Sequence, residues 1–70
     1  MIEIGQNEYI NPVYVVSTSI GEYDGEWVRY YVRIELTTRS ITRFFDGEDA
    51  ASRFVGYIIK AVQEVNHAHT

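Results

Sequence analysis

The sequence predicts an α+β fold, in which an antiparallel meander of three to four strands carries one C-terminal helix on one face. Two observations carry this prediction. Residues 27–36 alternate between apolar and polar side chains, which is the period of a half-buried strand. Residues 51–65 instead place their apolar side chains at helical spacing. The resulting order of elements, ββββα, fits a single domain that covers residues 1–70.

The first two strands are expected at residues 1–4 and 13–20. The first alternates weakly and ends at a Gly-Gln-Asn turn signal, whereas the second is dense in β-branched side chains. Pro12 separates them, because proline lacks an amide proton and restricts the residue before it. Residues 21–26 hold two glycines and an Asp-Gly pair, which predicts a hairpin turn into the next strand.

The strand expected at residues 27–36 has two chemically different faces. Its even positions are apolar or aromatic and are predicted to face the core. Its odd positions are mostly polar or amphipathic and are predicted to face outward: Trp27, Arg29, Tyr31, Arg33 and Glu35.

Residues 40–45 are expected to form the last strand of the meander. The turn before it has no glycine, so the pattern leaves its register open. Either Thr42 and Phe44 or Ile41 and Phe45 face the core. In the second case Phe44 is exposed, and in the first case Phe45 is exposed.

The helix is expected to begin at Asp46, whose carboxylate can cap it. Its flanks carry Tyr57 on one side and Ile59 on the other, which widens the apolar arc to about 200°, more than one sheet requires. Either the sheet wraps the helix or the helix meets a second surface, and residues 66–70 are expected to fray. The central stripe comprises Ala51, Phe54, Val55, Ile58, Val62 and Val65.

The composition is that of a small acidic domain with 70 residues, a net charge of −4 and no cysteine. Disulfides, thiolate metal sites and a cysteine nucleophile are thereby excluded. So short a chain buries only about 60% of its unfolded surface, so we expect a homo-oligomer, with a dimer favoured. The sequence has neither an apolar run long enough for a membrane span nor a signal-peptide pattern. We therefore expect a cytoplasmic protein that does not bind membranes.

Two short motifs occur within the predicted order of strands and helix: Ile10-Asn11-Pro12 and the Ile-Glu-Leu-Thr run of residues 34–37. In this order and in these motifs, the chain resembles the flagellar FlbD-like proteins and similar short phage-encoded proteins that share an I-N-P start. It departs from them at Thr38-Arg39, where the family has a glycine in the turn, and in a longer hairpin at residues 21–26. The resemblance implies a small regulatory or accessory protein without a catalytic site, and it transfers no functional residues.

Catalytic and metal-binding constellations are weak in this sequence. The histidines, His67 and His69, fall in the last four residues, where the backbone is usually poorly ordered. The serines of residues 13–20 have no neighbouring candidate base, and the chain lacks a Gly-rich phosphate loop. The acidic turn at residues 21–26 is shorter than an EF-hand loop and lacks its ligand pattern. We therefore expect no enzyme, no cofactor and no metal.

The most informative feature is the outward face of residues 27–36. Trp27, Arg29, Tyr31 and Arg33 alternate rings and guanidinium groups there, and Tyr57 adds a ring on the helix flank. Such side chains are typical of protein-protein hot spots and also of sheets that stack single-stranded nucleic acid. A third interpretation is a solvated polar face on which arginine stems cover the rings. The acidic net charge favours a protein partner over nucleic acid.

The acidic residues suggest a more specific hypothesis. The carboxylates of Glu22, Asp24 and Glu26, with those of residues 46–49, could imitate phosphate groups. We therefore expect a non-enzymatic protein-protein interaction module, in its specific form a phage- or mobile-element-encoded inhibitor of a host nucleic-acid-binding complex, such as an anti-CRISPR or other anti-defence protein. The alternatives are a sheet that binds single-stranded nucleic acid and a structural accessory subunit whose aromatic faces are used in self-assembly.

Overall fold

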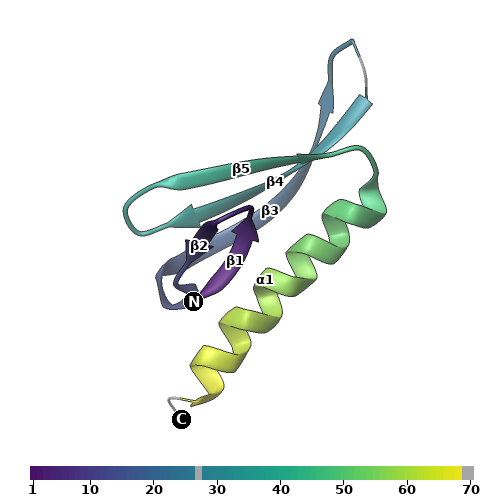
Figure 1. Cartoon of the computed structure of the whole chain (residues 1–70). Helices are drawn as coiled ribbons and strands as arrows, with labels where there is room; N and C mark the ends of the chain where they lie inside the picture. Colours follow the sequence, from purple (N-terminus) through teal and green to yellow (C-terminus); the bar gives the residue numbers. More distant parts are fainter. Residues whose placement is uncertain (27, 69–70) are drawn as a thin grey trace.

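A computed structural model of the chain describes residues 1–26 and 28–68, which form two antiparallel sheets and one C-terminal helix (Figure 1). This architecture confirms the predicted α+β fold. The elements in chain order are β1 (Ile2–Gly5), β2 (Glu8–Ile10), the 3-10 turn η1 (Pro12–Tyr14), β3 (Val15–Asp24), β4 (Val28–Leu36), β5 (Ser40–Phe45) and α1 (Glu48–Ala68).

The first strand does not extend the meander, because it pairs locally with β2. Ile2 lies opposite Ile10 in this two-stranded sheet. Asn7 turns the chain with a φ of 60°, a left-handed conformation that asparagine adopts more readily than most residues. The strand expected at residues 1–4 is therefore present, and it forms a separate hairpin with a strand that the sequence pattern did not indicate.

The three-stranded sheet has the order β3-β4-β5, and its first hairpin differs from the prediction. Residues 21–24 were expected in a turn, but they continue β3, and Asp24 lies opposite Val28. Continued pairing satisfies backbone groups that an open loop would leave to solvent. At its other end β3 begins at Val15, because the Asn11 side chain accepts a hydrogen bond from the Val13 amide at 3.1 Å and caps η1.

The open register of β5 is resolved in favour of Ile41 and Phe45. Ile41 lies opposite Ile34 of β4 and is buried with it. The ring of Phe45 lies 5.3 Å from that of Phe54 on the helix. Phe44 consequently faces away from the helix.

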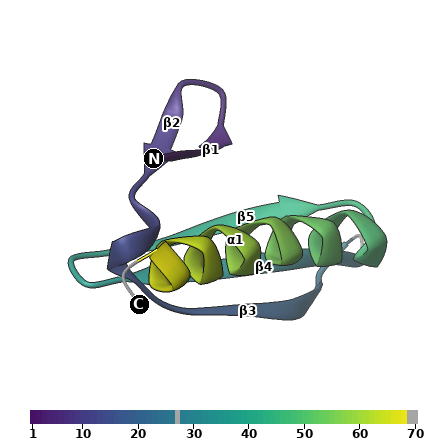
Figure 2. The same cartoon turned by 90° about the horizontal axis from the view of Figure 1, so that it is seen from below.

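Helix α1 lies along the face of the sheet that carries the core, in front of β4 (Figure 2). The Ala51 amide donates to the Gly47 carbonyl at 3.2 Å, which places Gly47, and not the expected Asp46, at the N-cap. The helix includes residues 66–68, which were expected to fray. The predicted stripe is confirmed, since Ala51 and Ile58 are fully buried and the rest of the stripe is half-buried.

The core lies between this helix and the sheet, and the β1–β2 hairpin closes one side of it. Val32, Ile34 and Ile58 are the largest fully buried side chains. Ile4 and Ile10 of the hairpin join the same cluster. In Figure 2 the hairpin stands on the β5 side of the helix, which leaves β3 along the opposite side.

Candidate functional site

Three aromatic rings form a continuous ridge on the outer sheet face, the face of β3–β5 that points away from α1. Tyr23 and Phe44 meet edge to face, with ring centroids 5.9 Å apart. The ring centroid of Tyr31 lies 6.4 Å from that of Phe44. Tyr23 is 54% exposed and Phe44 is 55% exposed, so most of this aromatic ridge faces solvent. Ring pairs with this geometry stabilise an interface by more than their buried area alone.

Strand register explains why rings from three strands meet. Tyr31 of β4 lies directly opposite Gly21 of β3 and Phe44 of β5. A β-carbon at Gly21 would overlap the Tyr31 ring, so the ring can lie over the backbone only because this residue is glycine. Tyr23 follows two residues after Gly21 and therefore projects on the same face.

Two guanidinium groups accompany the aromatic ridge. Arg29 lies opposite Tyr23, and both Arg29 and Arg33 are exposed. Arg33 Nε lies 3.3 Å from Glu35 Oε1 on the same face, which offsets part of its charge. The outer sheet face therefore combines aromatic area with a small positive charge.

The predicted site residues fall in three separate places. Arg29, Tyr31 and Arg33 share the outer sheet face as expected, whereas Trp27 lies outside the described residues. Tyr57 is on the helix, with its ring 6.5 Å from Phe54, and belongs to the opposite side of the molecule. Glu22, Asp24 and Glu26 lie toward the tip of the β3–β4 hairpin.

The fold gathers six carboxylates at one end, which we call the acidic end. Glu22 lies opposite Tyr30, which in turn lies opposite Phe45, so the β3–β4 tip and the start of α1 occupy the same end of the sheet (Figure 1). Its members are all exposed: Glu22, Asp24, Glu26, Asp46, Glu48 and Asp49.

Tyr23 and Phe44 were not among the predicted site residues. Tyr23 was expected in the hairpin turn of residues 21–26, and Phe44 lies on a strand whose register the pattern left open. The adjacent phenylalanines at positions 44 and 45 gave the one usable signal, since alternation forces one of them outward.

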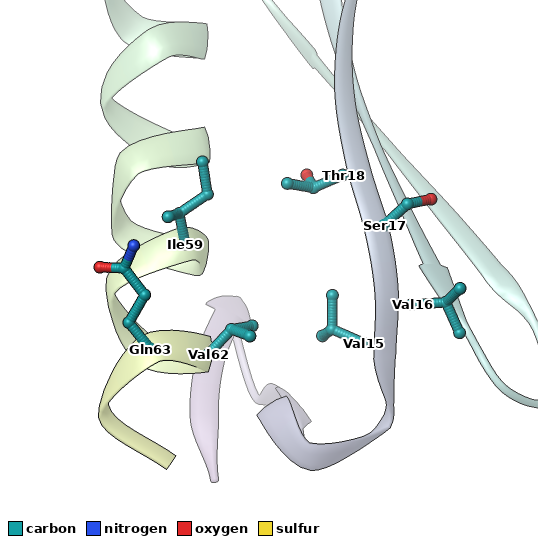
Figure 3. A pocket seen from close by; sticks show the side chains of 7 residues that line it. All are labelled: Val15, Val16, Ser17, Thr18, Ile59, Val62 and Gln63. Atoms are coloured by element: carbon teal, nitrogen blue, oxygen red, sulfur yellow. The ribbon is translucent and has the colours of Figure 1, made fainter. Parts of the chain in front are cut away.

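A narrow apolar groove of about 150 Å³ separates β3 from α1 (Figure 3). Val15 and Thr18 point toward the helix across it, while Val16 and Ser17 point away. Thr18 Oγ1 is buried without a hydrogen-bond partner among the described residues. None of the side chains along the groove is titratable, so it offers no group for acid-base catalysis: Val15, Val16, Ser17, Thr18, Ile59, Val62 and Gln63.

Residues 1–26 and 28–68 contain neither a metal-ligand cluster nor a helix that could span a membrane. In that part of the chain, no three histidine, cysteine, aspartate or glutamate side chains are grouped so as to hold a metal ion. No helix there is both long and apolar enough to cross a bilayer.

Comparisons with protein-family models, with curated proteins and with solved structures gave no match to this chain. The resemblance to FlbD-like proteins therefore stays a prediction. In the fold, its Ile10-Asn11-Pro12 motif has a structural use: Ile10 and Pro12 are buried, and Asn11 caps η1.

Proposed function

We propose that this chain is a non-enzymatic protein-binding module that docks through its outer sheet face. The aromatic ridge of Tyr23, Tyr31 and Phe44 is the observation that carries the proposal. Tyrosine is enriched in binding hot spots. Because the sheet already holds these rings in place, little side-chain conformational entropy is lost on binding. Tyr23 and Phe44 are both exposed and therefore accessible to a partner.

The charge distribution favours a protein over single-stranded nucleic acid. Nucleic-acid sheets combine stacking rings with a positive groove that follows the phosphates. Here one of the two arginines beside the ridge is paired with Glu35, and the acidic end adjoins the same strands. A net charge of −4 would also repel a polyanion at long range.

The acidic end supports a finer form of this proposal. A partner surface that is basic and normally binds nucleic acid would attract the six carboxylates and steer the encounter. The module would then inhibit that partner by occupying its nucleic-acid site, as an anti-CRISPR or other anti-defence protein would. This form rests on the gathering of sequence-distant carboxylates at one end of the fold.

A matched pair of double variants tests docking through the ridge. The tagged chain is incubated with an extract of cells that produce it, and retained proteins are quantified by mass spectrometry. We expect Tyr23→Ser with Phe44→Ser to lose the proteins that the native chain retains. Tyr9→Ser with Tyr14→Ser removes two equally exposed rings elsewhere, 54% each, and is expected to retain them. Equal retention by both variants would contradict the proposal.

Two more measurements separate the alternatives. Fluorescence anisotropy with single-stranded oligonucleotides at low salt is expected to show no binding. Binding that disappears in Arg29→Ala with Arg33→Ala would instead favour the nucleic-acid function. Neutralising the six carboxylates of the acidic end is expected to weaken capture of the partner, and unchanged capture would leave docking intact but reject the phosphate-mimicry form.

A further inference from the structure

We infer that β3 is a self-association edge, on which β3 of a second copy pairs antiparallel to join two three-stranded sheets into one. β3 is the outer strand of its sheet, and after an irregularity between Val15 and Ser17 its regular ladder covers residues 17–24, about 26 Å of edge. One side of such a strand presents unpaired amide and carbonyl groups, a template for another strand. This surface is distinct from the outer sheet face.

The edge continues into an apolar surface on the helix side of the sheet. Ile20 and Ile59 are each 41% exposed, and Ile59 lines the groove between β3 and α1. In Figure 2 the helix lies in front of β4, and no other described helix or strand lies beyond the β3 edge.

The lack of charge along this edge supports a second copy as the occupant. Residues 15–21 of β3 carry no charge, and neither do Ile59, Val62 and Gln63, the helix residues that line the groove beside β3. Copies of a chain with a net charge of −4 repel one another at long range, and this repulsion is smallest where two uncharged surfaces meet. A strongly acidic or basic partner would find no complementary group there.

The position of the charged residues also selects the antiparallel arrangement. Glu22 and Asp24 occupy the last part of β3. Antiparallel pairing moves these carboxylates to opposite ends of the interface, and with them the two acidic ends. Parallel pairing would place like charges side by side, which is destabilising.

The other edge of the sheet is less suited to this pairing. β5 is six residues long, and the β1–β2 hairpin is held on its side by an ion pair between Arg43 and Glu8. Because strand addition at β3 keeps both outer faces on one side of the joined sheet, the dimer would also present two aromatic ridges together.

Solution mass across a dilution series, measured by light scattering behind a sizing column, tests the interface. The native chain is expected at twice its 8.1 kDa mass. Ile59→Lys places a charge on the β3 flank and is expected to give monomers with an unchanged circular dichroism spectrum. Tyr57→Lys alters a similarly exposed residue on the opposite flank and is expected to remain dimeric. A native chain that is monomeric at every concentration would overturn the inference.

Site-specific crosslinking locates the interface without disturbing the core. The chain has no cysteine, so Ser19→Cys on β3 and Ser40→Cys on β5 each provide one reactive thiol on an exposed serine. A short bismaleimide is expected to link two copies through position 19 and not through position 40. Linkage that is equal at both positions, or greater at position 40, would place the contact elsewhere and overturn the inference even if Ile59→Lys fails to fold.

Discussion

The ring of Tyr31 lies over the backbone of Gly21, its partner across the β3–β4 ladder, and a β-carbon there would overlap the ring. This contact places Tyr31 against Phe44 and so holds the aromatic ridge together. Gly21 also stands within a strand, where glycine usually costs stability. Its presence in β3 is therefore explained by the ring that it accommodates.

Replacing Gly21 should disturb both stability and the aromatic ridge. We expect Gly21→Ala to lower the free energy of unfolding by about 1–3 kcal/mol, as overpacking does, because the Tyr31 ring must move. Gly56→Ala is the control, since it adds a methyl group where no atom lies within 4 Å and is expected to stabilise the helix by up to about 1 kcal/mol. Urea unfolding of both variants measures the two values, and a neutral Gly21→Ala would show that the contact is loose.

The two adjacent phenylalanines should respond oppositely to truncation. Phe45→Ala removes a half-buried ring that packs against Phe54 and is expected to cost about 3 kcal/mol, the low end for buried phenylalanine. Phe44→Ala removes an exposed ring and is expected to cost less than about 1 kcal/mol. Thermal unfolding compares them, and a larger loss for Phe44→Ala would mean that the register of β5 is the reverse.

Part of this fold was predictable from the sequence, and part was not. The alternation of β4 and the stripe of α1 were predictable, because burial on one face imposes a period of 2 on strands and about 3.6 on helices. The pairing of β1 with β2 and the extension of β3 to Asp24 depend on the position of the turns in the chain. Several turn positions are compatible with the same local residues, so composition alone does not choose between them.

The candidate site was likewise predictable only in part. Arg29, Tyr31 and Arg33 lie on one strand, so their common face followed from their odd numbering. Tyr23 and Phe44 join them only through the registers of β3 and β5. The acidic end likewise required the strand order, which puts the β3–β4 tip and the start of α1 at the same end of the sheet.

The ion pair between Arg43 and Glu8 should hold the β1–β2 hairpin against the sheet. Both side chains are about one-third exposed, so a double-mutant cycle of Arg43→Ala and Glu8→Ala is expected to give a coupling of about 1 kcal/mol or less. Hydrogen exchange should accelerate at Ile4 and Ile10 in either single variant. The more exposed pair of Arg33 and Glu35 serves as a reference, and a larger coupling there would contradict the anchoring role.

Truncation of the core should remove much of the stability of so small a domain. We expect Ile34→Ala to cost about 2–5 kcal/mol, because the side chain is fully buried between the sheet and the helix. Val13→Ala, at a position that is 54% exposed, is expected to cost less than about 0.5 kcal/mol. Denaturant midpoints of the two variants compare these losses, and similar midpoints would contradict the assigned core.

Photocrosslinking from position 44 tests the central claim, a protein-binding outer sheet face, most directly. Benzoylphenylalanine replaces Phe44 in one chain and Tyr57, exposed on the other side of the molecule, in a second. After irradiation in an extract of the producing cells, the account predicts an adduct with one particular protein from position 44 and none from position 57. Adducts with nucleic acid or with a second copy of this chain at position 44, or equal adducts at both positions, would contradict it.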